Sequence, residues 1–177
     1  MSVERHLFPD GPQHAPLLRM LLALDGSTTR LCEALAQAPV ELLLLHQRQT
    51  HEAPSAVREQ LGGSAWLARV TSLHAHGRVL MDNLSYTRLD AVPPWFLEGL
   101  DTGRAPIGHL LQHLYVRREA VAPSPELSQQ LWDHVGAPDP RASRSYRVVT
   151  PDGPLMLIFE AYRAGMAAAD PDAGRTP

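Results

Sequence analysis

The chain has 177 residues, a length that suits one domain built around a single continuous core. Hydrophobic residues make up 44% of the sequence and charged residues 20%, which excludes a chain that is disordered throughout. The formal net charge of -3 excludes the broad positive surface of a general nucleic-acid-binding protein.

The basic residues are chemically uniform. All 16 are arginines, and lysine is absent from the sequence. This excludes Schiff-base catalysis by a lysine and a phosphate-binding loop that depends on one. Because the guanidinium fork matches the geometry of a carboxylate, we expect an acidic small molecule as the partner, and no nucleic acid.

The cellular setting is indicated by what the chain does not contain. Cys32 is the single cysteine, so no disulfide forms within the chain, and cytoplasmic residence is expected. Residues 1–14 lack the apolar stretch of a secretory signal and predict a flexible N-terminal arm. The longest apolar runs, at residues 17–24 and 40–45, are too short to span a bilayer. We expect a soluble cytoplasmic monomer or homodimer that does not bind membranes.

The N-terminal part of the domain predicts two helices followed by a strand. Pro16 opens an apolar helix over residues 17–24, and Gly26 permits a turn after it. A second helix ends before Pro39, because proline disfavours helix in the residue before it. Residues 40–47 are apolar on both parities and predict a strand.

The clearest β pattern lies in the middle of the chain. Residues 66–73 and 79–87 flank a short turn that contains Gly77, which is typical of a hairpin. Short helices are expected between residues 89 and 113, and residues 115–121 predict a further strand.

A helix and a second hairpin complete the predicted domain. Ser124 caps a helix that runs to about residue 134, and residues 143–149 pair with residues 155–162. The sequence thus predicts one α+β domain over residues 15–163, with a mostly antiparallel sheet, helices inserted between the strands and a disordered tail over residues 164–177. It contains no glycine-rich nucleotide-binding turn, so we expect no nucleotide cofactor.

Two charged residues interrupt apolar strands. Glu160 follows the apolar run 154–159, and it is either an exposed strand end or a partly desolvated acid suited to proton transfer. Arg69 shares a strand face with Leu67 and Leu73, and it pairs either with an internal carboxylate or with a bound anion.

Two further arginines could reach the same space. Arg118 and Arg144 lie on other predicted strands, and alternation would turn Arg117 and Arg147 outward. Several arginines that converge on one pocket would suit a substrate with two carboxylates.

The histidines offer a weaker alternative. His74 and His76 alternate at a strand end, and His109 and His113 have helical spacing, so the four could form a zinc site. Because the first pair falls in a turn and no cysteine or carboxylate supports the set, we expect no metal. Cys32 lies among leucines and is expected to be a small buried hydrophobe.

Four stretches in order resemble the chorismate lyase (chorismate pyruvate-lyase) family, in particular its bacterial branch that forms 4-hydroxybenzoate. They are LALDGSTTRL at residues 22–31, WLARV at 66–70, APIGHLL at 105–111 and PLMLIFE at 154–160. The chain departs from the family at Asp82 and Asn83. Where the family often has two arginines, this chain retains one, Arg144.

The resemblance implies both the fold and the site. Arg69 takes the position of the family's substrate-binding arginine and Glu160 that of its essential glutamate, so both are expected to be catalytic. Ile107 and Gly108 stand in the loop that lines the pocket and are expected to bind substrate, together with Arg118 and Arg144.

The resemblance also implies a reaction that needs neither a metal nor another cofactor. Chorismate would be converted to 4-hydroxybenzoate and pyruvate in aromatic biosynthesis or secondary metabolism. Glu160, if it is protonated, would act there as an acid. Two alternatives stay open, namely a lyase of the same fold that acts on another chorismate-derived or enol-ether substrate, and a non-catalytic module that binds a small molecule.

Overall fold

The computed structural model describes residues 3–167, and its centre is one antiparallel sheet. The six strands lie in the spatial order β1-β2-β3-β6-β5-β4. Their bounds are β1 Glu41–Thr50, β2 Trp66–Ala75, β3 Arg78–Arg88, β4 Arg117–Val121, β5 Ser143–Thr150 and β6 Gly153–Tyr162.

The helices are inserted between these strands, as expected for an α+β domain. They are α1 Ala15–Ala23, α2 Thr28–Ala36, α3 Ser55–Leu61, α4 Pro94–Asp101, α5 Ile107–Leu111 and α6 Pro125–Val135, with 3-10 turns η1 Pro140–Ala142 and η2 Ala164–Met166. The predicted fold class is therefore confirmed.

Local chemistry explains where several elements begin and turn. The Ser27 hydroxyl accepts a hydrogen bond from the backbone N–H of Arg30 and so caps α2, and Ser124 caps α6 in the same way at Leu127. The β2–β3 hairpin turns through His76 and Gly77, which both have positive φ, as a tight turn between twisted strands requires.

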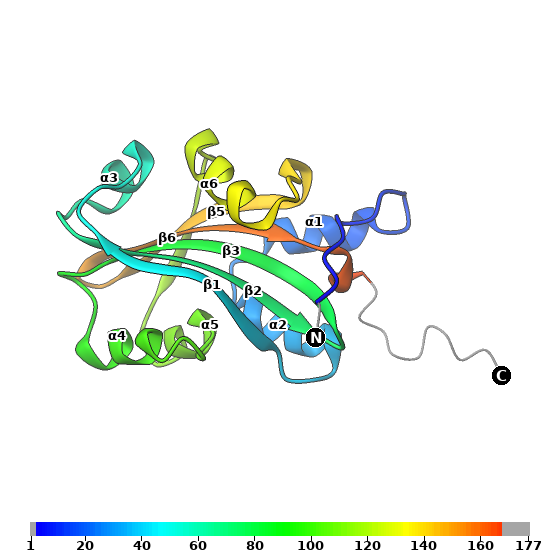
Figure 1. Cartoon of the computed structure of the whole chain (residues 1–177), viewed down its shortest axis with the longest axis horizontal. Coiled ribbons are helices and arrows are strands. Elements are labelled where there is room, and N and C mark those ends of the chain that lie inside the picture. Colours follow the sequence, from blue (N-terminus) through cyan, green and yellow to red (C-terminus); the bar gives the residue numbers. More distant parts are fainter. Residues whose placement is uncertain (1–2, 168–177) are drawn as a thin grey trace.

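Helices cover both faces of the sheet (Figure 1). Helices α3 and α6 pack on one face, where Val57 and Leu131 meet apolar residues of β2, β3 and β6 such as Phe159. Helices α4 and α5 pack on the other face, where Phe96 meets Ile158 and other apolar side chains. A third cluster joins α1 and α2 to one end of the sheet.

Strand alternation sorts the charged residues between these two faces. Arg69 shares a face of β2 with Leu67, and Glu160 shares a face of β6 with Ile158; both apolar residues belong to the core beneath α4 and α5. We call this the cavity face. Arg69 and Glu160 therefore lie on the same side of the sheet.

The ends of the domain contact its body. Phe8 is buried, and its backbone N–H donates to Asp139, while Leu7 forms an isolated bridge with Arg163. The part of the predicted arm that is described, residues 3–14, thus lies against the domain, because Phe8 completes the cluster around α1 and α2. Within the predicted tail, Met166 of η2 is buried, and residues 168–177 lie outside the described range.

Every helix within residues 3–167 is too short or too polar to traverse a bilayer.

Candidate functional site

A narrow cavity lies between the sheet and helices α2 and α5. Strands β2, β3, β6, β5 and β4 supply its floor, and Ile107, Gly108 and Leu111 supply part of its cover. Its polar lining residues are Thr28, Thr29, Thr71, Asn83, Arg118, Tyr146 and Glu160.

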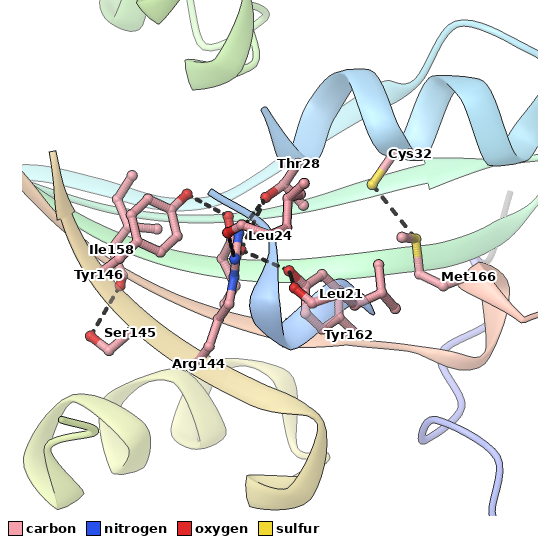
Figure 2. Close-up of polar contacts among 11 residues, drawn as sticks. Leu21, Leu24, Thr28, Cys32, Arg144, Ser145, Tyr146, Ile158, Tyr162 and Met166 are labelled. Carbon is pink, nitrogen blue, oxygen red and sulfur yellow. Dashed lines mark hydrogen bonds and ion pairs between the residues drawn. The ribbon is translucent and has the colours of Figure 1, made fainter. Parts of the chain in front are cut away.

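Hydrogen-bond donors surround Glu160, which is only 2% exposed. Its Oε1 accepts from the Tyr146 hydroxyl at 2.7 Å. Its Oε2 accepts from Arg144 Nε at 2.9 Å and from the Thr28 hydroxyl at 3.1 Å. The Tyr162 hydroxyl lies 3.2 Å from the same oxygen, and its single hydrogen is shared with the nearer Leu21 carbonyl at 3.0 Å. Figure 2 shows these four side chains pointing toward one another from α2, β5 and β6.

The sheet register places Arg144 beside the carboxylate, because Arg144 of β5 stands directly opposite Glu160 of β6. Its other two guanidinium nitrogens donate to the Leu24 carbonyl and to the Thr28 hydroxyl. Burial is the largest single influence on the pKa of Arg144 and lowers it, but the facing Glu160 carboxylate together with Tyr162 and Tyr146 leaves the net pKa raised. Arg144 lies behind Glu160 and does not line the cavity.

Both tyrosines next to Glu160 are held in the neutral form. Burial, reinforced by the negative charge of Glu160, raises the pKa of the Tyr146 phenol well above its ordinary value. The same two causes raise the pKa of Tyr162. Each phenol therefore keeps its proton at neutral pH and remains a hydrogen-bond donor.

Arg69 faces the same side but stands apart from Glu160. It is 1% exposed, and its two terminal nitrogens donate to the Ala105 carbonyl at 3.2 and 3.3 Å. In the sheet, Arg69 of β2 stands opposite Ser85 of β3. Glu160 lies on the following strand, β6, and two residues further along, so the strand spacing places Arg69 and Glu160 about 12 Å apart. Burial lowers the pKa of Arg69 to about 10. Arg69 does not line the cavity.

Three other predicted residues do line the cavity. Arg118 projects from the edge strand β4, while Ile107 and Gly108 begin α5. Among the described residues Arg118 has no side-chain hydrogen bond, and its Nε is buried. A Cβ on Gly108 would lie 2.3 Å from Thr29 Oγ1, so the close contact between α5 and α2 requires glycine there.

The polar atoms that lack a partner concentrate on the cavity face. In the described part of the chain, seven buried side-chain nitrogen or oxygen atoms have no hydrogen bond. Two belong to Arg163 on the opposite face. The other five lie on the cavity face: Gln47 Oε1, Arg69 Nε, Asn83 Oδ1, Ser85 Oγ and Arg118 Nε. Hydrogen-bonding capacity that the protein itself does not use is therefore concentrated on the cavity face.

Sequence reasoning missed several residues of the site. Thr28 lies within the stretch 22–31 that carries the resemblance. Because Ser27 caps α2, the Thr28 hydroxyl is available to reach Glu160. Tyr146 is two residues from Arg144 and therefore lies on the same face of its strand, which is the sign in the sequence that could have identified it. Asn83 interrupts an apolar strand, as Glu160 does.

Two of the four histidines considered as zinc ligands make other contacts. His109 Nε2 lies 3.0 Å from Glu33 Oε1 and so joins α5 to α2, and His76 Nε2 lies 2.9 Å from the Ala36 carbonyl. Within residues 3–167, no group of three or more histidine, cysteine or acidic side chains is placed to hold a metal ion.

Several solved structures have a similar fold. PhnF from Mycobacterium smegmatis aligns with a TM-score of 0.50 at 16% identity, over 81% of this chain and 66% of PhnF. The C-terminal domain of the histidine utilization repressor from Pseudomonas syringae pv. tomato gives 0.47 at 13% identity, over 78% and 99% of the two chains. A GntR-family regulator from Bacillus cereus gives 0.45 at 13% identity, over 78% and 96%. At these identities the likeness concerns the fold alone.

The sequence comparison is more specific. No curated protein matches the sequence significantly. A family profile described as "Chorismate pyruvate-lyase Rv2949c-like" matches residues 22–169. This range includes every residue of the cavity, and it includes Glu160 with Thr28, Arg144, Tyr146 and Tyr162, which we call the Glu160 cluster. The chain therefore belongs to the Rv2949c-like chorismate pyruvate-lyase family.

Proposed function

We propose that this protein converts chorismate to 4-hydroxybenzoate and pyruvate. The observation that carries the proposal is a cavity bordered by a buried carboxylate, Glu160, and by an arginine with no hydrogen-bond partner among the described residues, Arg118. Family membership supplies the reaction class.

The cavity suits a small ring that carries acidic groups. Leu73, Met81 and Ile158 offer apolar contacts to a ring, and polar groups at the margin offer hydrogen bonds. Two arginines on the same face, Arg69 and Arg118, have a buried Nε without a partner, which suits a ligand with two carboxylates.

The atoms of chorismate alone balance the reaction. The bond between the ring and the ether oxygen breaks, and the ring carbon that bears the hydroxyl loses its hydrogen. The enolpyruvyl fragment gains a proton at its methylene carbon and leaves as pyruvate, while the ring becomes aromatic. The protein must hold two carboxylates, handle one proton and exclude water.

The described residues divide these tasks among themselves. Arg118 reaches the cavity directly and takes one carboxylate. Arg69 lies outside the lining of the cavity, and it takes the other carboxylate once the Ala105 carbonyl has moved away from its guanidinium. Glu160, at the cavity wall, exchanges the proton with the ring, and Ile107 and Gly108 cover the substrate.

Incubation of the purified protein with chorismate tests the proposal. Release of 4-hydroxybenzoate, followed by absorbance, together with pyruvate, followed by a coupled dehydrogenase, is the expected result. Chorismate that binds without being consumed would indicate a binding module instead, and chorismate that neither binds nor reacts would indicate a different substrate.

A further inference from the structure

We infer that Arg144 is a positioning residue that holds Glu160 in its carboxylate form, so that Glu160 receives a proton from the substrate and does not donate one. The catalytic part of the inference, the transfer of a proton from the substrate, rests on the proposed function. The inference replaces two sequence-based expectations: that Arg144 binds substrate and that Glu160 is a protonated acid.

The first step is that all three guanidinium nitrogens of Arg144 bind atoms of the protein. Nε donates to Glu160, one terminal nitrogen donates to the Leu24 carbonyl and the other donates to Thr28. The guanidinium also lies over the ring of Tyr146 at 4.8 Å and near that of Tyr162 at 5.9 Å. A side chain held from so many directions is a fixed part of the wall, in contrast to Arg118.

The second step fixes the direction of one hydrogen bond. A guanidinium can only donate, so the Thr28 oxygen accepts from Arg144. The single hydrogen of the Thr28 hydroxyl is then free to point at Glu160 Oε2, 3.1 Å away. Arg144 therefore places two donors on that oxygen, one directly and one through Thr28.

The third step concerns the proton. The Tyr146 phenol, which stays protonated, donates to the other carboxylate oxygen. With donors on both oxygens and a guanidinium at 2.9 Å, Glu160 is satisfied as an anion and would lose its charge-assisted bond if it were protonated. A carboxylate at the cavity wall accepts the ring proton, and Glu160 as the resulting acid then delivers it to the methylene carbon of the departing enol.

The other charged and titratable groups near Glu160 do not reverse this balance. Arg118 on β4 adds positive charge from across the cavity. On α2, burial and then the Glu160 charge raise the pKa of the Cys32 thiol, which keeps it neutral. The carboxylate of Glu33, on the same helix, lies 3.0 Å from His109. On β3, the neighbour of Glu160 is Asn83, which carries no charge.

The test is a carbon-13 NMR titration of the glutamate side-chain carboxyls in the ligand-free protein, with the Glu160 signal assigned by Glu160→Gln. We expect the carboxylate signal at neutral pH and a titration midpoint that rises by about one pH unit or more in Arg144→Gln. Arg144→Lys should return the midpoint toward that of the parent. The matched control is Arg147→Gln on the same strand, which faces the opposite side and pairs with Glu119, and it should leave the midpoint unchanged.

Two results would overturn the inference: a neutral Glu160 at pH 7, or a midpoint that does not move in Arg144→Gln. If that variant does not fold, Thr28→Val removes one donor only and should raise the midpoint by a smaller amount. Because this readout needs no substrate, it stands even if chorismate proves not to be the substrate. Where turnover is present, the acidic limb of the kcat profile should move with the NMR midpoint. A limb that stays in place would refute the catalytic part of the inference.

Discussion

Arg69 is buried in β2, and its Nε has no hydrogen-bond partner among residues 3–167. Its lowered pKa shows that burial of the charge is unfavourable in the free protein. Under the proposed function Arg69 serves the ligand rather than stability, because a buried charge without a counter-charge carries a desolvation cost that an apolar side chain does not.

Arg69→Met should therefore separate stability from function. We expect a melting temperature equal to or above that of the parent, and a fall in kcat/KM of at least about tenfold, or 1.4 kcal/mol. Thermal unfolding and steady-state kinetics measure the two effects. Arg147→Met, whose guanidinium pairs with Glu119, is the matched control and should retain kcat/KM. A less stable Arg69→Met protein with unchanged kinetics would make Arg69 a structural residue.

Tyr162 gives a prediction on alkaline stability. Its pKa is raised in the folded protein by burial and by Glu160, whereas in the unfolded chain it is near 10. The folded state thus keeps a proton that the unfolded state loses. The contribution of Tyr162 is fully present below about pH 10 and is lost above it, by up to about 1.4 kcal/mol for each pH unit.

Urea unfolding of Tyr162→Phe between pH 8 and pH 11 measures this term. The variant should show a shallower loss of unfolding free energy above pH 10 than the parent. Tyr115→Phe, at a position that is 84% exposed, should keep the parent's slope. Equal slopes in all three proteins would show that Tyr162 ionises as easily in the folded state as in the unfolded chain.

The sequence identified which charged residues matter better than it identified their contacts. Glu160 and Arg69 stood out because each interrupts an apolar strand, and both prove to be buried on the cavity face. The partner of Glu160 is Arg144 rather than Arg69, because the β5–β6 register sets Arg144 opposite Glu160. Local patterns do not fix the register of a sheet to the residue, so this pairing could not be derived from the sequence.

At the scale of elements, helices α2 and α5 form the cover of the cavity. They touch where Gly108 meets Thr29, and the pair formed by His109 and Glu33 joins them again on the outer side. Neither helix is long, so their relative position depends on these contacts.

Gly108→Ala should displace this cover. The added Cβ would meet Thr29 Oγ1 at 2.3 Å, and relief of that clash moves α5 away from α2. We expect a loss of about 1–3 kcal/mol in unfolding free energy together with weaker binding of 4-hydroxybenzoate, measured by urea unfolding and calorimetry. Gly26→Ala is the control, because its Cβ would make only an ordinary 3.5 Å contact with Leu24. Parent-like binding by Gly108→Ala would show that the cover does not depend on this contact.

The elements themselves were largely predictable. Both hairpins and helix α6 carry turn and capping signals that act within a few residues, and the structure confirms them. The packing of residues 3–14 was not predictable, because it depends on Phe8 reaching Asp139 and the cluster around α1 and α2, which are distant in sequence.

At the scale of the whole molecule, the architecture by itself does not define the function. The sheet with helices on both faces aligns with PhnF at 16% identity, and this likeness concerns the fold alone. The family profile that matches the sequence, in contrast, is that of a lyase. The fold therefore does not decide whether the cavity only binds its ligand or also transforms it. That decision depends on the Glu160 cluster and on the arginines of the cavity face.

A single-turnover incubation of chorismate with excess protein tests this most directly. The account predicts pyruvate and 4-hydroxybenzoate in equal amounts from the parent protein, at a rate that falls at least about tenfold in a folded Glu160→Gln variant. Chorismate recovered intact after binding, one product without the other, or a Glu160→Gln variant as fast as the parent would contradict it.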